Sequence, residues 1–172
     1  NERIKVYKRL PDGKVKQYLS FMQDITEKKT ASLALVESEE RYRNFISYSS
    51  EGIYYTNCGE PIPIHLPIEE QTKLFYQNAY VEECNLVMAK MYEFQSEAEM
   101  IGQTISHLHQ GEDYEVNKNS FRDIINKDYK VDDVETIEIT PSGEKCYFLN
   151  RAAGVIEKDH LVGMWGVQRD IT

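Results

Sequence analysis

Residues Asp159 to Thr172 read DHLVGMWGVQRDIT, an apolar strand pattern that closes on Asp-Ile-Thr. Residues Gly13 to Thr26, GKVKQYLSFMQDIT, repeat this pattern and end on the same tripeptide. Another extended segment precedes each copy, Ile4 to Arg9 in the first and Lys145 to Ile156 in the second, with turn-forming residues in between. This internal repeat predicts that the same structural ending, a hairpin followed by a joint, occurs twice.

The segment between the two copies is predicted to contain a helix. Residues Glu27 to Phe45 contain no Gly or Pro and are rich in Glu, Lys, Ala and Leu. Leu35, Tyr42 and Phe45 fall on one narrow seam of this helix, together with Ala31 and Ser38. The seam predicts a parallel homodimer through the helix. The alternative is a solvated connector helix that lies on its own domain.

The remainder of the chain alternates short helical and extended patterns. A strand rich in aromatic and β-branched residues is expected at Glu51 to Asn57, where Asn57-Cys58-Gly59 ends it. The other expected elements are helices at Ile68 to Ala79, Leu86 to Phe94, Glu97 to Ile101 and Val116 to Tyr129, and strands at Tyr80 to Cys84, Val134 to Thr140, Lys145 to Ile156 and Leu161 to Asp170. This pattern predicts an α+β domain.

Composition narrows the functional classes. The net charge of -9 argues against nucleic acid as a partner, because phosphate binding needs clustered Lys and Arg. No apolar run approaches the roughly 20 residues that cross a bilayer, so we expect no membrane contact in this segment and a cytoplasmic location, with a membrane tether elsewhere in the parent left open. The chain starts at Asn1 and is expected to be a piece of a longer protein.

Chemical motifs are mostly missing. No phosphate loop, HExxH pair, nucleophile elbow or EF-hand spacing occurs, so no metal site and no catalytic activity are expected. Cys58, Cys84 and Cys146 form no CxxC pair and are expected to be reduced thiols that pack in the core.

A group of short signatures carries a family resemblance. These are Glu39-Glu40-Arg41-Tyr42-Arg43, Glu51-Gly52-Ile53, Asn85, Gly102, Ser142-Gly143 and the closing Gly166-Val167-Gln168-Arg169-Asp170-Ile171-Thr172. In this order they resemble the PAS family of sensory domains. The resemblance implies a five-stranded antiparallel sheet with several short helices on one face and a ligand cavity between them.

The resemblance also implies domain boundaries. Residues 1–26 correspond to the last strands of a preceding PAS domain, residues 27–45 to a connector helix, and residues 46–172 to a complete sensor domain. The chain departs from the family at residues 59–79, which carry three prolines and an extra helix. This insert either covers the cavity or is a surface elaboration.

Alignment to the family implies which side chains face the cavity. It places Phe148, Asn150, Met164, Gly166 and Gln168 inward, and Tyr147, Leu149, Trp165 and Val167 outward. The candidate ligand-binding residues are Phe148, Asn150, Met164, Gln168, Met88 and Phe121. The two amides either orient a small polar ligand or satisfy backbone groups and water.

The Asp-Ile-Thr endings resemble the family's joint between sensor and effector. Asp24 with Thr26, and Asp170 with Thr172, are the predicted signal joints. The carboxylate of each can accept hydrogen bonds from backbone donors and from the Thr hydroxyl. By resemblance, an effector such as a histidine kinase or a diguanylate cyclase would begin after Thr172.

Neither haem nor flavin is expected. His107 and His109 lie where haem-binding relatives place an axial ligand, but the following Gln110-Gly111-Glu112-Asp113 suggests an exposed loop. Asn57-Cys58-Gly59 lacks the rest of the flavin-reactive cysteine motif and lies too early in the chain.

Three functions follow from these patterns. The leading hypothesis is a sensory module that binds a small molecule and transmits a signal through its flanking helices. The second is a dimerisation and relay module with a filled core and no ligand. The third is a stand-alone small-molecule enzyme, for which the repeated Asp-Ile-Thr joint has no use.

Overall fold

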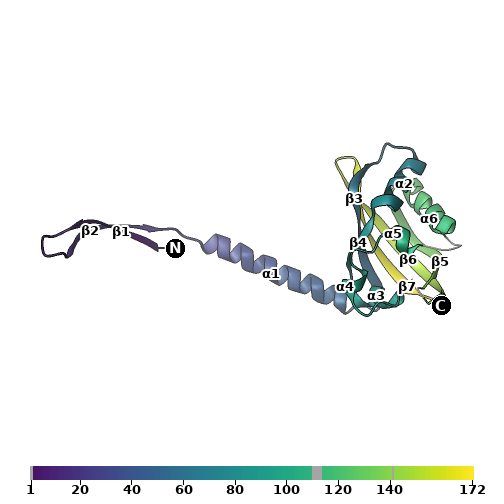
Figure 1. Cartoon of the computed structure of the whole chain (residues 1–172), viewed down its shortest axis with the longest axis horizontal. Coiled ribbons are helices and arrows are strands. Elements are labelled where there is room, and N and C mark those ends of the chain that lie inside the picture. Colours follow the sequence, from purple (N-terminus) through teal and green to yellow (C-terminus); the bar gives the residue numbers. More distant parts are fainter. Residues whose placement is uncertain (1, 110–113, 141) are drawn as a thin grey trace. The chain divides into compact units, whose positions relative to one another are not determined.

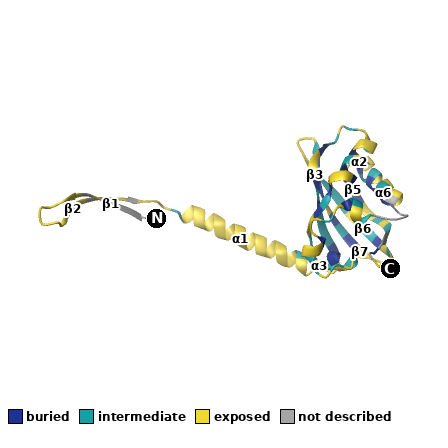
Figure 2. Ribbon diagram, in the orientation of Figure 1, coloured by how far each residue is buried: buried dark blue, intermediate teal, exposed yellow. Residues whose placement is uncertain are grey.

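The computed structural model describes residues 2–109, 114–140 and 142–172. The chain divides into two compact units, Asn1–Phe45 and Ile46–Thr172. In the first unit, strands β1 (Glu2–Arg9) and β2 (Val15–Met22) form an antiparallel hairpin. Helix α1 (Thr26–Ser47) follows it and has no buried residue, as Figure 2 shows. The predicted hairpin and helix are therefore both present.

The second unit contains one five-stranded sheet. Its strand order is β4-β3-β7-β6-β5, and every neighbouring pair is antiparallel. The strands are β3 (Gly52–Pro63), β4 (Tyr80–Cys84), β5 (Lys130–Ile139), β6 (Lys145–Glu157) and β7 (His160–Asp170). The predicted α+β class and five-stranded sheet are confirmed.

Short helices of the described part of this unit lie on one face of the sheet (Figure 1). They are α2 (Ile68–Asn78), α3 (Leu86–Met91), α4 (Glu97–Met100), α5 (Ile105–Leu108) and α6 (Tyr114–Asn126). The hydrophobic core forms between these helices and the sheet, where the ribbon in Figure 2 carries the dark blue of buried residues. No helix in the described part of the chain is long and apolar enough to cross a membrane.

Strand β3 is longer than predicted. The turn-forming residues Asn57-Cys58-Gly59 predicted that this strand ends at Asn57. In the structure its pairing with β7 resumes at Ile62, after a break in register. Gly59 makes this bulge with a φ of 72°, and a Cβ there would lie 2.8 Å from the carbonyl oxygen of Asn78. Pro61 falls inside the break, where its missing N–H costs no ladder hydrogen bond.

Two helical predictions also need correction. Helix α3 ends at Met91 rather than at Phe94, because Glu93 adopts a φ of 63° and the chain closes in a turn. Helix α5 was not predicted, since four residues are too few to show a helical period. The predicted loop at residues 110–113 lies outside the described residues.

The buried side chain of Asn85 connects the start of the domain to α3. Its Oδ1 accepts hydrogen bonds from the backbone N–H groups of Met88, at 2.9 Å, and Ile53, at 3.0 Å. Its Nδ2 donates to the carbonyl oxygens of Glu51, at 2.9 Å, and Ile46, at 3.2 Å. One amide therefore caps a helix and satisfies three further backbone groups that precede or begin β3.

We expect Asn85→Ala to lower the free energy of unfolding by about 2–4 kcal/mol, since a lost cap costs about 1 kcal/mol and each unpaired buried backbone group about 1–3 kcal/mol. Urea denaturation measures this change. Ser96→Ala is the matched control, because Ser96 occupies the N-cap of α4 without a side-chain cap hydrogen bond. A loss below about 1 kcal/mol for Asn85→Ala would contradict this role for Asn85.

Candidate functional site

The second unit contains a partly open cavity of about 100 Å³ between the sheet and the helices. Its apolar and aromatic lining residues are Tyr54, Phe75, Tyr76, Val81, Met88, Tyr92, Met100, Ile105, Leu108, Phe121, Ile124, Val131, Val134, Ala152 and Met164. Its polar lining residues are Thr56, His109, Asn117, Ser120, Thr136, Asn150 and Gln168. No Asp, Glu, Lys or Arg occurs among the described lining residues, so these residues offer the cavity no fixed charge.

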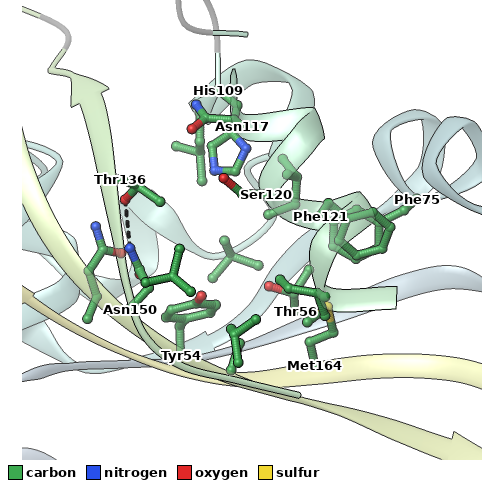
Figure 3. Close-up of a pocket in the computed structure, with 18 of the residues that line it drawn as sticks. Tyr54, Thr56, Phe75, His109, Asn117, Ser120, Phe121, Thr136, Asn150 and Met164 are labelled. Carbon is green, nitrogen blue, oxygen red and sulfur yellow. Dashed lines mark hydrogen bonds between the residues drawn. The ribbon is translucent and has the colours of Figure 1, made fainter. Parts of the chain in front are cut away.

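Helices α2 and α6 form the wall opposite the sheet. Phe75 of α2 stacks on Phe121 of α6, with ring centroids 4.0 Å apart and planes 16° apart (Figure 3). Outside the wall, Arg122 donates two hydrogen bonds of 2.8 Å to the two carboxylate oxygens of Glu69. This bidentate pair links the same two helices and holds the pKa of Glu69 below its usual range.

Polar groups lie at two places on the cavity surface. On the sheet side, Asn150 Nδ2 donates a 2.6 Å hydrogen bond to Thr136 Oγ1, drawn as a dashed line in Figure 3. On the helix side, the Tyr76 hydroxyl and His109 Nδ1 are 3.0 Å apart and share a hydrogen bond. These pairs satisfy part of their own hydrogen-bonding capacity without any ligand.

Gln168 is the exception among the polar lining residues. Its side chain comes from β7, is 1% exposed and lines the cavity. Among the buried side-chain nitrogen and oxygen atoms of the described residues, only its Nε2 has no hydrogen-bond partner. An unpaired buried donor costs about 1–3 kcal/mol, so this atom is where an additional partner would stabilise the protein most.

Tyr54 is placed in the cavity by a glycine on the neighbouring strand. Tyr54 of β3 pairs with Gly166 of β7, and a Cβ at position 166 would collide with the Tyr54 ring. Only glycine leaves room for this aromatic side chain against the sheet. The tyrosine ring then lies along the floor of the cavity (Figure 3).

Comparisons with known proteins agree with this architecture. The PAS domain family profile matches residues 74–172, which is more than half of the chain. This chain belongs to the PAS domain family.

Solved structures share the fold at low sequence identity. A PAS domain of a protein from Colwellia psychrerythraea has a TM-score of 0.57 and 18% identity, and the match covers 77% of this chain and 96% of that one. The Rhodobacter sphaeroides LOV protein has a TM-score of 0.53 and 15% identity over 78% and 67% of the two chains.

A third solved structure is the PAS domain of a LuxR-family transcriptional regulator from Burkholderia thailandensis, in complex with ethanol. Its TM-score is 0.54 and its identity 12%, over 76% of this chain and 96% of that one. At such identities the comparison shows the fold alone. A comparison with curated protein sequences finds no match.

Five of the six predicted ligand-binding residues line the cavity of this PAS domain: Asn150, Met164, Gln168, Met88 and Phe121. Their contact with a ligand stays a prediction. The sequence reasoning missed Tyr54 and Tyr76, and it considered His109 only as a haem ligand. The alternation along β3 could have pointed to Tyr54, because Tyr54 and Thr56 share one face of that strand.

Phe148 requires a correction. It faces inward and is 1% exposed, but it does not line the cavity. Its ring stacks on Tyr92, with centroids 6.2 Å and planes 18° apart, and Tyr92 provides the cavity surface instead. Strand alternation gives the face of a residue but not which neighbour stands between it and the cavity.

The insert at residues 59–79 contributes to the site. Its helix α2 supplies Phe75 and Tyr76 to the cavity lining. Gln71 of the same helix is buried, donates to the carbonyl oxygens of Ile64 and Leu66, and accepts a 2.7 Å hydrogen bond from the Tyr129 hydroxyl. These contacts support a role for the insert as part of the cavity cover.

The two predicted signal joints have matching geometry. Asp24 Oδ1 accepts a 2.9 Å hydrogen bond from the backbone N–H of Thr26, and Asp170 Oδ1 accepts one of the same length from Thr172. Hydrogen bonds from the hydroxyl and backbone of Thr26 lower the pKa of Asp24. At the second joint, Thr172 Oγ1 also accepts from the Tyr147 N–H at 2.9 Å.

The predicted dimer seam is exposed on α1. Leu35 is 60% exposed, Tyr42 46% and Phe45 74%. Leu33 and Val36, which lie off the seam, are exposed as well. Apolar side chains therefore occur around much of the helix, and pairing through the seam stays a prediction.

The thiols and His107 offer little chemistry to the cavity. Burial raises the pKa of Cys58 to about 12 and that of Cys84 to about 11, so both are protonated and weakly nucleophilic at neutral pH. His107 is exposed, whereas His109 lines the cavity. No group of His, Cys, Asp and Glu in the described part of the chain could hold a metal ion.

We expect Asp24→Ala to accelerate amide hydrogen exchange at Thr26 while leaving the thermal midpoint of the PAS domain unchanged. Asp170→Ala should accelerate exchange at Thr172 and lower the free energy of unfolding by no more than about 1 kcal/mol, as for a lost cap. Asp12→Ala is the control, since Asp12 makes the same type of bond to Lys14 in the β1–β2 turn. Outright unfolding of Asp170→Ala would show that the joint is a core element instead.

Proposed function

We propose that this PAS domain is a sensory module that binds a small molecule in its cavity and transmits occupancy to an effector, such as a histidine kinase or a diguanylate cyclase. The observation that carries the proposal is a cavity-lining glutamine, Gln168, whose buried Nε2 has no hydrogen-bond partner. PAS domains are generally non-catalytic sensory modules, and the cavity presents no activated nucleophile among its described residues. We therefore assign it binding and not catalysis.

A relay module with a filled core is the competing function. Such a module has no use for a cavity of about 100 Å³, because an unfilled cavity lowers stability in proportion to its volume. It would also have no reason to bury an amide donor without a partner. Both features favour a ligand-binding role over a purely structural one.

The cavity size supports the absence of a large prosthetic group. An apolar cavity of about 150 Å³ accommodates a molecule of the size of benzene, so this smaller cavity suits neither haem nor flavin. The protonated Cys58 also lacks the thiolate character that a reactive cysteine needs. The three free cysteines support a cytoplasmic site of action.

The proposed signal path starts on β7. Met164 and Gln168 line the cavity from this strand, and Asp170 follows two residues after Gln168. A ligand that reorients the Gln168 amide would thus act next to the hydrogen bonds that hold Thr172. Asp24 and Thr26 would act in the same way for the preceding sensor, with α1 as the receiving helix.

We expect a library of small neutral compounds to include several that shift backbone NMR resonances of cavity residues such as Met164, Gln168 and Phe121 in a saturable manner. Ala152→Leu should weaken this binding at least tenfold, because Ala152 lines the cavity and the larger side chain would occupy it. Ala153→Leu, on the adjacent residue, is the matched control.

The filled-core function would be favoured if no compound produced saturable shifts at cavity residues. The same samples test the cofactor prediction, since the purified chain should show no visible absorption band. A Soret or flavin spectrum would contradict the assignment.

We further propose that α1 pairs with its counterpart in a parallel homodimer through Leu35, Tyr42 and Phe45. Burying such side chains contributes roughly 1.5–3 kcal/mol each, and association costs at least several kcal/mol, so the dimer should be weak. Contacts from neighbouring domains of a longer protein would strengthen it.

Leu35→Glu is expected to weaken the dimer measured by sedimentation equilibrium while leaving the circular dichroism spectrum nearly unchanged, because it places a charge in the seam. Leu33→Glu is the control, since Leu33 is 70% exposed but lies off the seam. A wild-type chain that stays monomeric at high concentration would refute the seam and leave α1 as a connector.

A further inference from the structure

We infer that the cavity takes a small, uncharged molecule with an apolar body and one hydrogen-bond acceptor, of the class of short cyclic or branched ketones. The acceptor would receive its hydrogen bond from Nε2 of Gln168. This inference rests on the proposed function and specifies the ligand class for the same cavity.

The need for an acceptor follows from the hydrogen bonds already made around the cavity. Asn150 Nδ2 donates to Thr136, and the Tyr76 hydroxyl is paired with His109 Nδ1. The remaining buried side-chain group of the described residues without a partner is a donor, Nε2 of Gln168, and a carbonyl oxygen is its natural complement. A ligand without an acceptor would leave this N–H group unpaired in a smaller and drier space.

The absence of charge follows from the lining. Among the described lining residues there is no Asp, Glu, Lys or Arg to pair with an ionised ligand. Two basic side chains of α6 are paired with carboxylates: Arg122 binds Glu69, and Lys118 pairs with Glu115 at 3.3 Å. An ion in the cavity would lose its hydration without a compensating partner, which is strongly unfavourable.

The apolar body and its size follow from the walls and the volume. The stacked rings of Phe75 and Phe121 lie on one side, and the thioethers of Met88 and Met164 add further apolar surface. A cavity of about 100 Å³ holds roughly five to seven non-hydrogen atoms, by comparison with a cavity of about 150 Å³ that binds benzene. Such a ligand would bury most of its surface against carbon and sulfur and would direct its one polar atom at Gln168.

Four probes of similar size test the ligand class on the whole chain at pH 8. Cyclopentanone carries the acceptor, and methylenecyclopentane replaces its oxygen with a CH2 group of the same shape. Cyclopentylammonium and cyclobutanecarboxylate carry a positive and a negative charge. NMR titration gives an affinity for each probe, and the side-chain amide protons of Gln168 report the hydrogen bond directly.

We expect cyclopentanone to move the Gln168 Nε2 protons downfield in the wild-type chain, and methylenecyclopentane to leave them nearly unmoved. Gln168→Met should weaken cyclopentanone binding roughly three- to tenfold, as for one lost hydrogen bond, without weakening methylenecyclopentane binding. Both charged probes should bind at least tenfold more weakly than cyclopentanone. Gln103→Met, which alters a glutamine outside the cavity, should change none of these affinities.

Equal effects of Gln168→Met on cyclopentanone and methylenecyclopentane, or a charged probe that binds as tightly as the ketone, would overturn the ligand class. If Gln168→Met does not fold, the wild-type amide shifts decide: equal movement with both neutral probes overturns the inference. If library compounds saturate the cavity but cyclopentanone does not, the inferred ligand class is wrong and the proposed function still holds. When no compound binds, the proposed function fails with it.

Discussion

The four hydrogen bonds of the Asn85 side chain are the constraint on which the geometry of the PAS domain depends. They tie the start of α3 to the backbone at Ile46, Glu51 and Ile53, just where β3 enters the sheet. The backbone of Asn85 donates back to the carbonyl of Ile53, so the two segments are held from both sides. β3 is thereby fixed against α3, the first helix after the second strand of the sheet.

The cavity is a consequence of how the helices are held off the sheet. The bidentate pair between Arg122 and Glu69 joins α6 to α2 on the outside, and their stacked phenyl rings meet on the inside. Below them, the sheet presents small residues at Gly166 and Ala152, which pair with each other across β6 and β7. The Tyr54 ring takes the room over Gly166, and the cavity lies between this ring and the helices.

Much of the fold could be predicted from the sequence because its signals are local. The family resemblance implied that Met164 and Gln168 lie on the inner face, and both line the cavity. The continuation of β3 past Asn57 could not be predicted, since the turn at Gly59 is set by the close approach of Asn78 from another element. Phe148 was misassigned to the cavity for the same reason, because Tyr92 from a distant turn intervenes.

Cavity-lining residues and the predicted signal joint, Asp170 with Thr172, lie close together along the paired strands β6 and β7. Asn150 pairs with Gln168, and two residues further along Phe148 pairs with Asp170. The next backbone bond joins Ile171 to Tyr147, whose own N–H donates to the Thr172 hydroxyl. Under the proposed function, a change at the Gln168 amide would have to pass only one pair of residues before it reached Asp170. Since adjacent ladder residues are coupled through backbone hydrogen bonds, a sensor built this way needs no long chain of side chains to transmit occupancy.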